Sequence, residues 1–124
     1  MPAALATAVV MRMRGNKIQF AVVREDPALP ATLVDKFAAR RVLLIGSGGC
    51  TALTLRCLHP DLKVTLLDPN QAQLALIERK ITALGEPPGS RRRTLFNIDD
   101  DRANGLSQCG NFESLFRGLR GFLN

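Results

Sequence analysis

The feature that most constrains the fold is an aliphatic run that stops at a cluster of glycines. Arg41–Ile45 is such a run, and Gly46-Ser-Gly-Gly49 follows it directly. A short run that is apolar on both faces is typical of a strand inside a parallel sheet, because helices cover both faces of such a sheet. Lys63–Leu67 is a second run of the same kind. The two runs therefore predict a parallel sheet with flanking helices.

Helical patterns alternate with these two strands. Cys50–Leu58 follows the glycine cluster, and Gln71–Leu84 carries leucine and isoleucine along one stripe before Gly85. Apolar residues at three- and four-residue spacing predict a helix, and a glycine is a common stop after it. The order strand, helix, strand, helix forms a βαβα unit. Its parallel strands end at one edge, where open α/β folds bind their ligands.

We expect four regions along the chain: a helical and extended lead-in at 1–40, the βαβα core at 41–85, an exposed linker at 86–110 and an amphipathic helix at 111–124. The linker contains an acidic triplet at 99–101, which we interpret as a solvated loop. Two strands make an incomplete sheet, since stable sheets usually have three or more. We therefore expect exposed apolar surface and self-association.

The lead-in contains three weaker patterns. Residues 3–11 are apolar but no positive charge precedes them, which favours a frayed helix over a secretory signal. Leu29, Leu33 and Phe37 recur every four residues and predict a short helix at 31–39. Residues 18–23 are a candidate third strand.

Composition excludes several classes of function. No apolar run reaches the length of about 18 residues that a membrane span needs. The net charge is +6, but the chain has neither Trp nor Tyr, so aromatic stacking on nucleic-acid bases is not expected. The three cysteines have no CxxC spacing and their number is odd, which favours a reduced, cytoplasmic setting. No cluster of residues predicts a metal site.

The glycine cluster and an acidic residue together predict a nucleotide-like cofactor site. Glycines allow a tight turn and a close approach of ligand to backbone. Asp68 ends the second strand, twenty residues after Gly48, where a carboxylate can accept hydrogen bonds from ribose hydroxyls. The simpler alternative is an ordinary strand-to-helix turn with a surface Asp beside Pro69.

The pattern excludes two other nucleotide motifs. A dinucleotide fingerprint has a third glycine where Thr51 stands, and a phosphate-binding P-loop ends in Gly-Lys-Ser/Thr, unlike Gly49-Cys-Thr51. Residues 42–49 are more similar to the first motif of S-adenosylmethionine (AdoMet) dependent transferases. The fold class that we predict is therefore α/β, a Rossmann-like class I AdoMet-binding fold with an incomplete parallel sheet.

Four segments together resemble one family. They are Arg24-Glu-Asp-Pro27, Ser47-Gly-Gly-Cys-Thr-Ala52, Asp68-Pro-Asn-Gln-Ala-Gln-Leu74 and Gly110-Asn-Phe-Glu-Ser-Leu-Phe-Arg117. They are similar to segments of the AdoMet-dependent 3-amino-3-carboxypropyltransferases of betaine-lipid synthesis. The resemblance covers residues 18–120, which correspond to the opening third of a typical family member, so it implies a truncated member.

The resemblance implies AdoMet as cofactor and a diacylglycerol hydroxyl as acceptor, at the inner membrane surface. It assigns cofactor binding to one set of residues: Gly46, Ser47, Gly48, Gly49, Asp68, Asn70 and Gln73. Glu25 is the candidate catalytic residue, as an acceptor base or ammonium ligand, while Asp26 is either functional or a turn cap. Two alternatives remain open. One is a small-molecule methyltransferase, and the other is an inactive cofactor-binding or interaction remnant.

Overall fold

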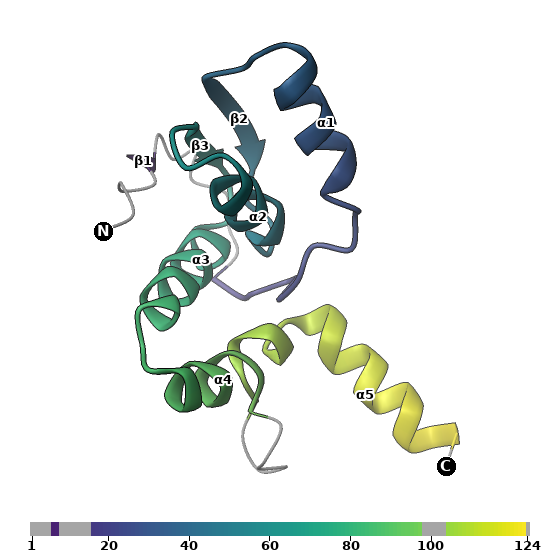
Figure 1. Ribbon diagram of the computed structural model, residues 1–124. Helices are drawn as coiled ribbons and strands as arrows, with labels where there is room; N and C mark the ends of the chain where they lie inside the picture. The colour runs from purple at the N-terminus through teal and green to yellow at the C-terminus, as the bar shows by residue number, and fades with distance from the viewer. Residues whose placement is uncertain (1–5, 8–15, 98–103, 124) are drawn as a thin grey trace.

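The computed structural model describes residues 6–7, 16–97 and 104–123 of a mixed α/β chain (Figure 1). Its elements, in chain order, are β1 (Ala6–Thr7), α1 (Ala28–Lys36), β2 (Arg41–Ile45), α2 (Cys50–Leu58), β3 (Lys63–Leu67), α3 (Gln71–Leu84), α4 (Pro88–Phe96), the 3-10 turn η1 (Leu106–Gln108) and α5 (Asn111–Leu123). None of the described helices is long and apolar enough to cross a membrane.

The two predicted strands are confirmed, and they pair in parallel. Val42 of β2 lies opposite Val64 of β3, and Leu44 lies opposite Leu66. The two-residue strand β1 pairs with the other side of β3, also in parallel, so the order is β1-β3-β2. Both long strands end at the same edge, next to the glycine turn.

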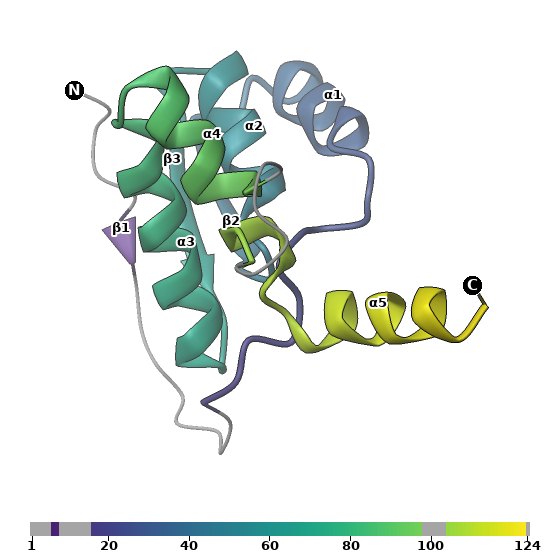
Figure 2. The ribbon, with the colours of Figure 1, turned by 90° about the horizontal axis from the view of Figure 1, so that it is seen from below.

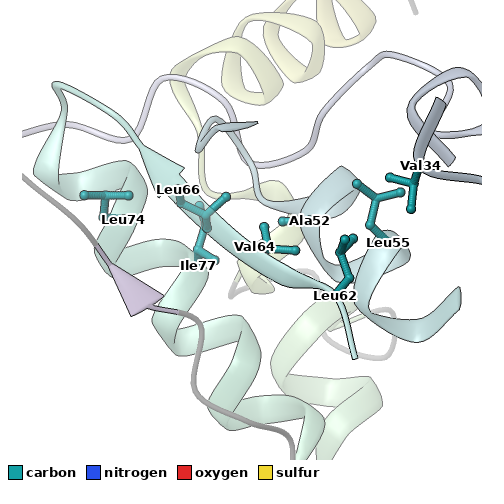
Figure 3. Close-up of a cluster of buried hydrophobic side chains, with 8 residues drawn as sticks. All are labelled: Val34, Ala52, Leu55, Leu62, Val64, Leu66, Leu74 and Ile77. Carbon is teal, nitrogen blue, oxygen red and sulfur yellow. The ribbon is translucent and has the colours of Figure 1, made fainter. Parts of the chain in front are cut away.

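The main core lies on one face of this sheet. Helices α1, α2 and α3 contribute Val34, Ala52, Leu55, Leu74 and Ile77, which meet Leu62, Val64 and Leu66 from β3 and the residue before it (Figure 3). Successive side chains of a strand point to opposite faces. Leu43 and Ile45 of β2 therefore lie on the other face, where they are 67% and 69% exposed. One face of the sheet is packed and the other is open.

The prediction of an exposed linker at 86–110 is wrong for the first half of that range, because Pro88–Phe96 form helix α4. Proline occupies the first turn of this helix, where its missing N–H costs nothing. Leu95 is buried with Leu76 and Ala83 of α3 and with Leu106. This packing against α3 stabilises a segment whose own residues give no helical apolar stripe. The triplet at 99–101 lies outside the described residues.

The lead-in also differs from the prediction. Residues 6–7 form strand β1 rather than a helix, and the remainder of the predicted frayed helix at 3–11 lies outside the described residues. Helix α1 begins three residues earlier than predicted, since Asp26 Oδ1 accepts a hydrogen bond from Ala28 N at 2.9 Å. It ends before Ala38, which has a left-handed backbone (φ 47°). Residues 18–23 form no strand.

Helix α5 is present as predicted and projects away from the sheet and from α1 to α4 (Figure 2). Most of its apolar stripe is exposed, and Phe122 is 87% exposed. Together with the open sheet face, this confirms the prediction that the chain taken alone leaves a sizeable apolar surface in contact with solvent.

Candidate functional site

The glycine turn joins β2 to α2 at the carboxyl edge of the sheet. Gly46 N donates to Leu67 O at 3.0 Å, which ties the turn to the end of β3, and Gly49 N donates to Gly46 O at 2.9 Å. Gly49 has φ +79°, a left-handed conformation that favours glycine, and it precedes the first residue of α2. The turn is therefore held tightly at the end of the two parallel strands.

Asp68 lies directly against this turn and is only 6% exposed. Its Oδ2 accepts a hydrogen bond from Ser47 N at 2.8 Å, and its Oδ1 accepts one from Asn70 N at 2.9 Å. A carboxylate that receives backbone N–H groups on both oxygens is a strong local anchor. The structure thus brings Asp68 and the glycine turn together, as predicted, and shows them bonded to each other.

Asn70 and Gln73 contact residues 17–24, which were not predicted from the sequence to lie at the site. We call residues 17–24 the strap. Asn70 Oδ1 caps α3 by accepting from Ala72 N, while its Nδ2 donates to Lys17 O at 2.8 Å. Asn70 thus links the start of α3 to the beginning of the strap.

Gln73 holds the middle of the strap and is 2% exposed. Its Oε1 accepts from Gln19 N at 2.6 Å and from Phe20 N at 3.3 Å. Its Nε2 donates to Phe20 O at 2.8 Å and to Ser47 O at 2.6 Å. An amide has two donor hydrogens and two acceptor lone pairs. All four are used here, so Gln73 joins the strap to the glycine turn.

Lys80 also joins the strap to the glycine turn, and it was not predicted from the sequence. We call these contacts of α3 with the strap and the glycine turn the seam. The buried Nζ of Lys80 donates to Gly48 O at 2.7 Å and also to Ala21 O. Burial lowers the pKa of Lys80 below its usual value, because desolvation penalises the charged form. The sequence spacing could have indicated Lys80, since Gln73 and Lys80 are seven residues apart and therefore lie on the same buried face of α3.

The close approach that Gly48 permits is used by the strap. A Cβ at Gly48 would lie 2.7 Å from Val22 Cα, far inside van der Waals contact. From the sequence, this glycine was predicted to allow the close approach of a ligand. In the structure it admits the protein's own backbone.

The strap also holds the start of α5. Asn111 N donates to Ile18 O at 2.9 Å, and the buried Glu113 accepts from Ala21 N at 2.9 Å through Oε2. The other carboxylate oxygen of Glu113 lies 3.5 Å from Arg24 Nη2, and the Arg24 guanidinium lies 4.7 Å from the Phe112 ring centroid. No motif predicted Glu113 as a partner of Arg24, because residues so far apart in sequence give no spacing signal.

Glu25 lies apart from this seam, at a cleft of about 710 Å³ beside the end of β2. Ser47 and Thr51 line one side of the cleft, and Arg24, Glu25 and Asp26 line another. The remaining walls are mainly apolar and include Phe20, Leu29, Leu33, Leu44, Ile45 and Phe112. Glu25 and Asp26 are exposed, and Asp26 accepts the hydrogen bond from Ala28 N described above. Ser47 is the residue that the glycine turn shares with this cleft.

Comparison of the chain with protein-family models, with curated proteins and with solved structures gave no significant match. Within residues 6–7, 16–97 and 104–123, no group of three or more His, Cys, Asp or Glu side chains is placed to hold a metal ion.

Proposed function

We propose that the chain is an AdoMet-binding protein with a Rossmann-like class I fold, and that the cleft beside β2 receives the amino-acid end of the cofactor. The observation that carries this proposal is the composition of the cleft. Ser47 of the glycine turn lines the same space as Arg24 and Glu25. The glycine turn and these two charged side chains thus lie together at the carboxyl edge of the parallel strands, where open α/β folds bind ligands.

The cleft fits the amino-acid end of AdoMet in size and charge. Its volume of about 710 Å³ lies within the range of roughly 300–1,000 Å³ of small-molecule sites. The methionine part carries a carboxylate and an ammonium group. Arg24 supplies a cation for the first, and Glu25 and Asp26 supply anions for the second. The apolar walls suit the methylene groups between these charges.

The nucleoside end fits only after a movement of the strap. Each oxygen of Asp68 already accepts one backbone hydrogen bond, and the side chain is nearly inaccessible. Gln73 has no donor or acceptor left. Movement of residues 17–24 away from α3 would free the amide of Gln73 for a ribose, whereas Asp68 would stay bonded to Ser47 and Asn70.

The reaction that we propose, on the basis of the family resemblance, is transfer of the 3-amino-3-carboxypropyl group to a diacylglycerol hydroxyl. The protein would act in the cytoplasm, at the membrane surface. When bound, AdoMet would supply an electrophilic carbon next to its sulfonium; as the acceptor oxygen bonds to that carbon, the carbon–sulfur bond would break and 5′-methylthioadenosine would leave. Glu25 is exposed at the cleft, and its side chain makes no hydrogen bond or ion pair within the described part of the chain. The ammonium group of AdoMet needs one anion, so Glu25 either pairs with it or, where Asp26 does so, accepts the proton of the acceptor hydroxyl.

A second function is favoured by a specific observation, the use of Asp68, Asn70 and Gln73 for internal contacts. A chain that keeps the turn and the acidic residue only to hold its strap would be an inactive interaction module. Unlike the first proposal, this one requires no affinity for AdoMet.

Calorimetric titration of the full chain with AdoMet separates the two functions. We expect binding, weakened by about ten-fold in Glu25→Gln, since a charge-assisted hydrogen bond is worth about 1.5–3 kcal/mol. Glu78→Gln is the matched control, because Glu78 is an exposed carboxylate on α3, outside the cleft. No binding by the parent chain would overturn the proposal and favour the interaction module. Incubation with AdoMet labelled in either the carboxyl or the methyl carbon would show which group is transferred.

A further inference from the structure

A second cleft lies at the opposite edge of the sheet, where β2 and β3 begin. It has a volume of about 810 Å³ and is lined by Ala39, Arg40 and Arg41 and by residues 58–63. The strand β2 has five residues, so this cleft is about 16 Å from the glycine turn. It is therefore separate from the candidate cofactor site.

The two loops that form this cleft are fixed by backbone groups. Lys63 N donates to Arg40 O at 3.0 Å and joins one loop to the other. The guanidinium of Arg56 donates to Leu62 O at 2.8 Å and also to Pro60 O. These bonds set the shape of the loop after α2 before any ligand is present, which reduces the ordering cost of binding.

Three cations on these loops have no partner among the residues that the structure describes. Arg40, Arg41 and Lys63 are exposed, and within the described residues their side chains form neither a hydrogen bond nor an ion pair. The acidic residue that lines the cleft is Asp61, so the lining keeps two net positive charges. Arg56 shows the contrast, since its guanidinium is committed to backbone carbonyls.

This combination of charge and shape selects a class of ligand. Guanidinium groups present a planar fork of donors that matches phosphate oxygens, and lysine adds a compact point charge. The volume exceeds what an isolated phosphate needs, and Leu58 and Pro60 supply an apolar part of the wall. The cleft therefore suits a phosphate group attached to a partly apolar body.

We propose that the cleft between the amino ends of β2 and β3 binds a phosphate-bearing ligand through Arg40, Arg41 and Lys63. The phosphate belongs either to a soluble phosphorylated molecule or to a lipid headgroup, and the chemistry of recognition is the same. The site is independent of the proposed AdoMet function, because it shares no residue with the glycine turn or with the cleft that contains Glu25.

The test uses two probes on the full chain. Calorimetry with inorganic pyrophosphate measures binding of a soluble phosphate. Co-sedimentation with vesicles of phosphatidylcholine and phosphatidic acid, compared with vesicles of phosphatidylcholine alone, measures binding of a lipid phosphate. Binding of either probe supports the proposal, and the probe that binds identifies the source of the phosphate.

The double variant Arg41→Gln/Lys63→Gln should weaken that binding about ten- to hundred-fold, as expected for the loss of charge-assisted hydrogen bonds. The matched control is Arg92→Gln/Arg93→Gln, which removes from α4 two exposed cations that have no partner in the described part of the chain, and it should bind like the parent. If the double variant does not fold, as judged by circular dichroism, Arg40→Gln replaces it with the same expected direction. Equal weakening in the control, or no binding of either probe by the parent, would overturn the proposal.

Discussion

Replacing Gln73 with leucine removes the four hydrogen bonds that its amide makes, while a side chain of similar length remains in place. Three of these bonds are shorter than 3 Å, and the fourth, from Phe20 N, is 3.3 Å long. Each is worth about 0.5–1.5 kcal/mol net, so Gln73→Leu should lower the free energy of unfolding by roughly 2–6 kcal/mol. That is a large part of the roughly 5–15 kcal/mol that stabilises a typical domain.

Urea denaturation followed by circular dichroism measures this change, and hydrogen exchange locates it. The amides of Gln19 and Phe20 should lose protection, because their acceptor is gone. Gln71→Leu is the control, since Gln71 is exposed on the same helix and its replacement should change stability by less than about 0.5 kcal/mol. A change of the same small size in Gln73→Leu, with both amides still protected, would refute the role of Gln73 as an anchor of the strap.

Three further predictions concern the turn, the seam and the open surface. Gly48→Val should destabilise the fold by more than about 1 kcal/mol, measured by chemical denaturation, because its Cβ would collide with the backbone of Val22. Between the lowered pKa of Lys80 in the folded chain and its ordinary value of 10.5, the unfolded chain binds more protons than the folded one. The free energy of unfolding of the parent, measured relative to that of Lys80→Met, should therefore rise with pH in that window. A difference between the two proteins that does not depend on pH would contradict this. Phe122→Ser should reduce self-association in analytical ultracentrifugation and hydrophobic-dye binding, since this side chain is exposed; an unchanged sedimentation profile would count against α5 as the contact.

The parts of the fold that follow local patterns could be predicted from sequence. Strands β2 and β3 and helices α2 and α3 are each defined by apolar periodicity and by a glycine or polar stop, and their bounds agree with the structure. Helix α4 could not be predicted in this way. Its formation depends on the burial of Leu95 against α3, a tertiary contact that no local spacing reveals.

The candidate site shows the same division. The glycine turn and Asp68 were predicted to lie at the same edge of the sheet because both follow the ends of parallel strands, and the hydrogen bond from Ser47 N to Asp68 Oδ2 agrees with that position. The strap was missed because residues 18–23 were a candidate strand, whereas in the structure they pair with no strand. Its position is set instead by polar side chains that lie 53 residues away in Gln73 and 92 residues away in Glu113.

The strap links the stability of the fold to the proposed binding of AdoMet. If the nucleoside end takes the place of the strap beside α3 without bonding to Gln73, the strap must first leave α3, and the free energy of that step is subtracted from the binding energy. An opening cost of about 3 kcal/mol would weaken the apparent affinity by roughly a hundred-fold. Gln73→Leu should therefore bind AdoMet more tightly than the parent in calorimetry, although it is the less stable protein. Weaker binding by this variant would instead identify Gln73 as a ligand of the cofactor, and unchanged affinity would mean that the strap and the nucleoside do not compete for the same groups.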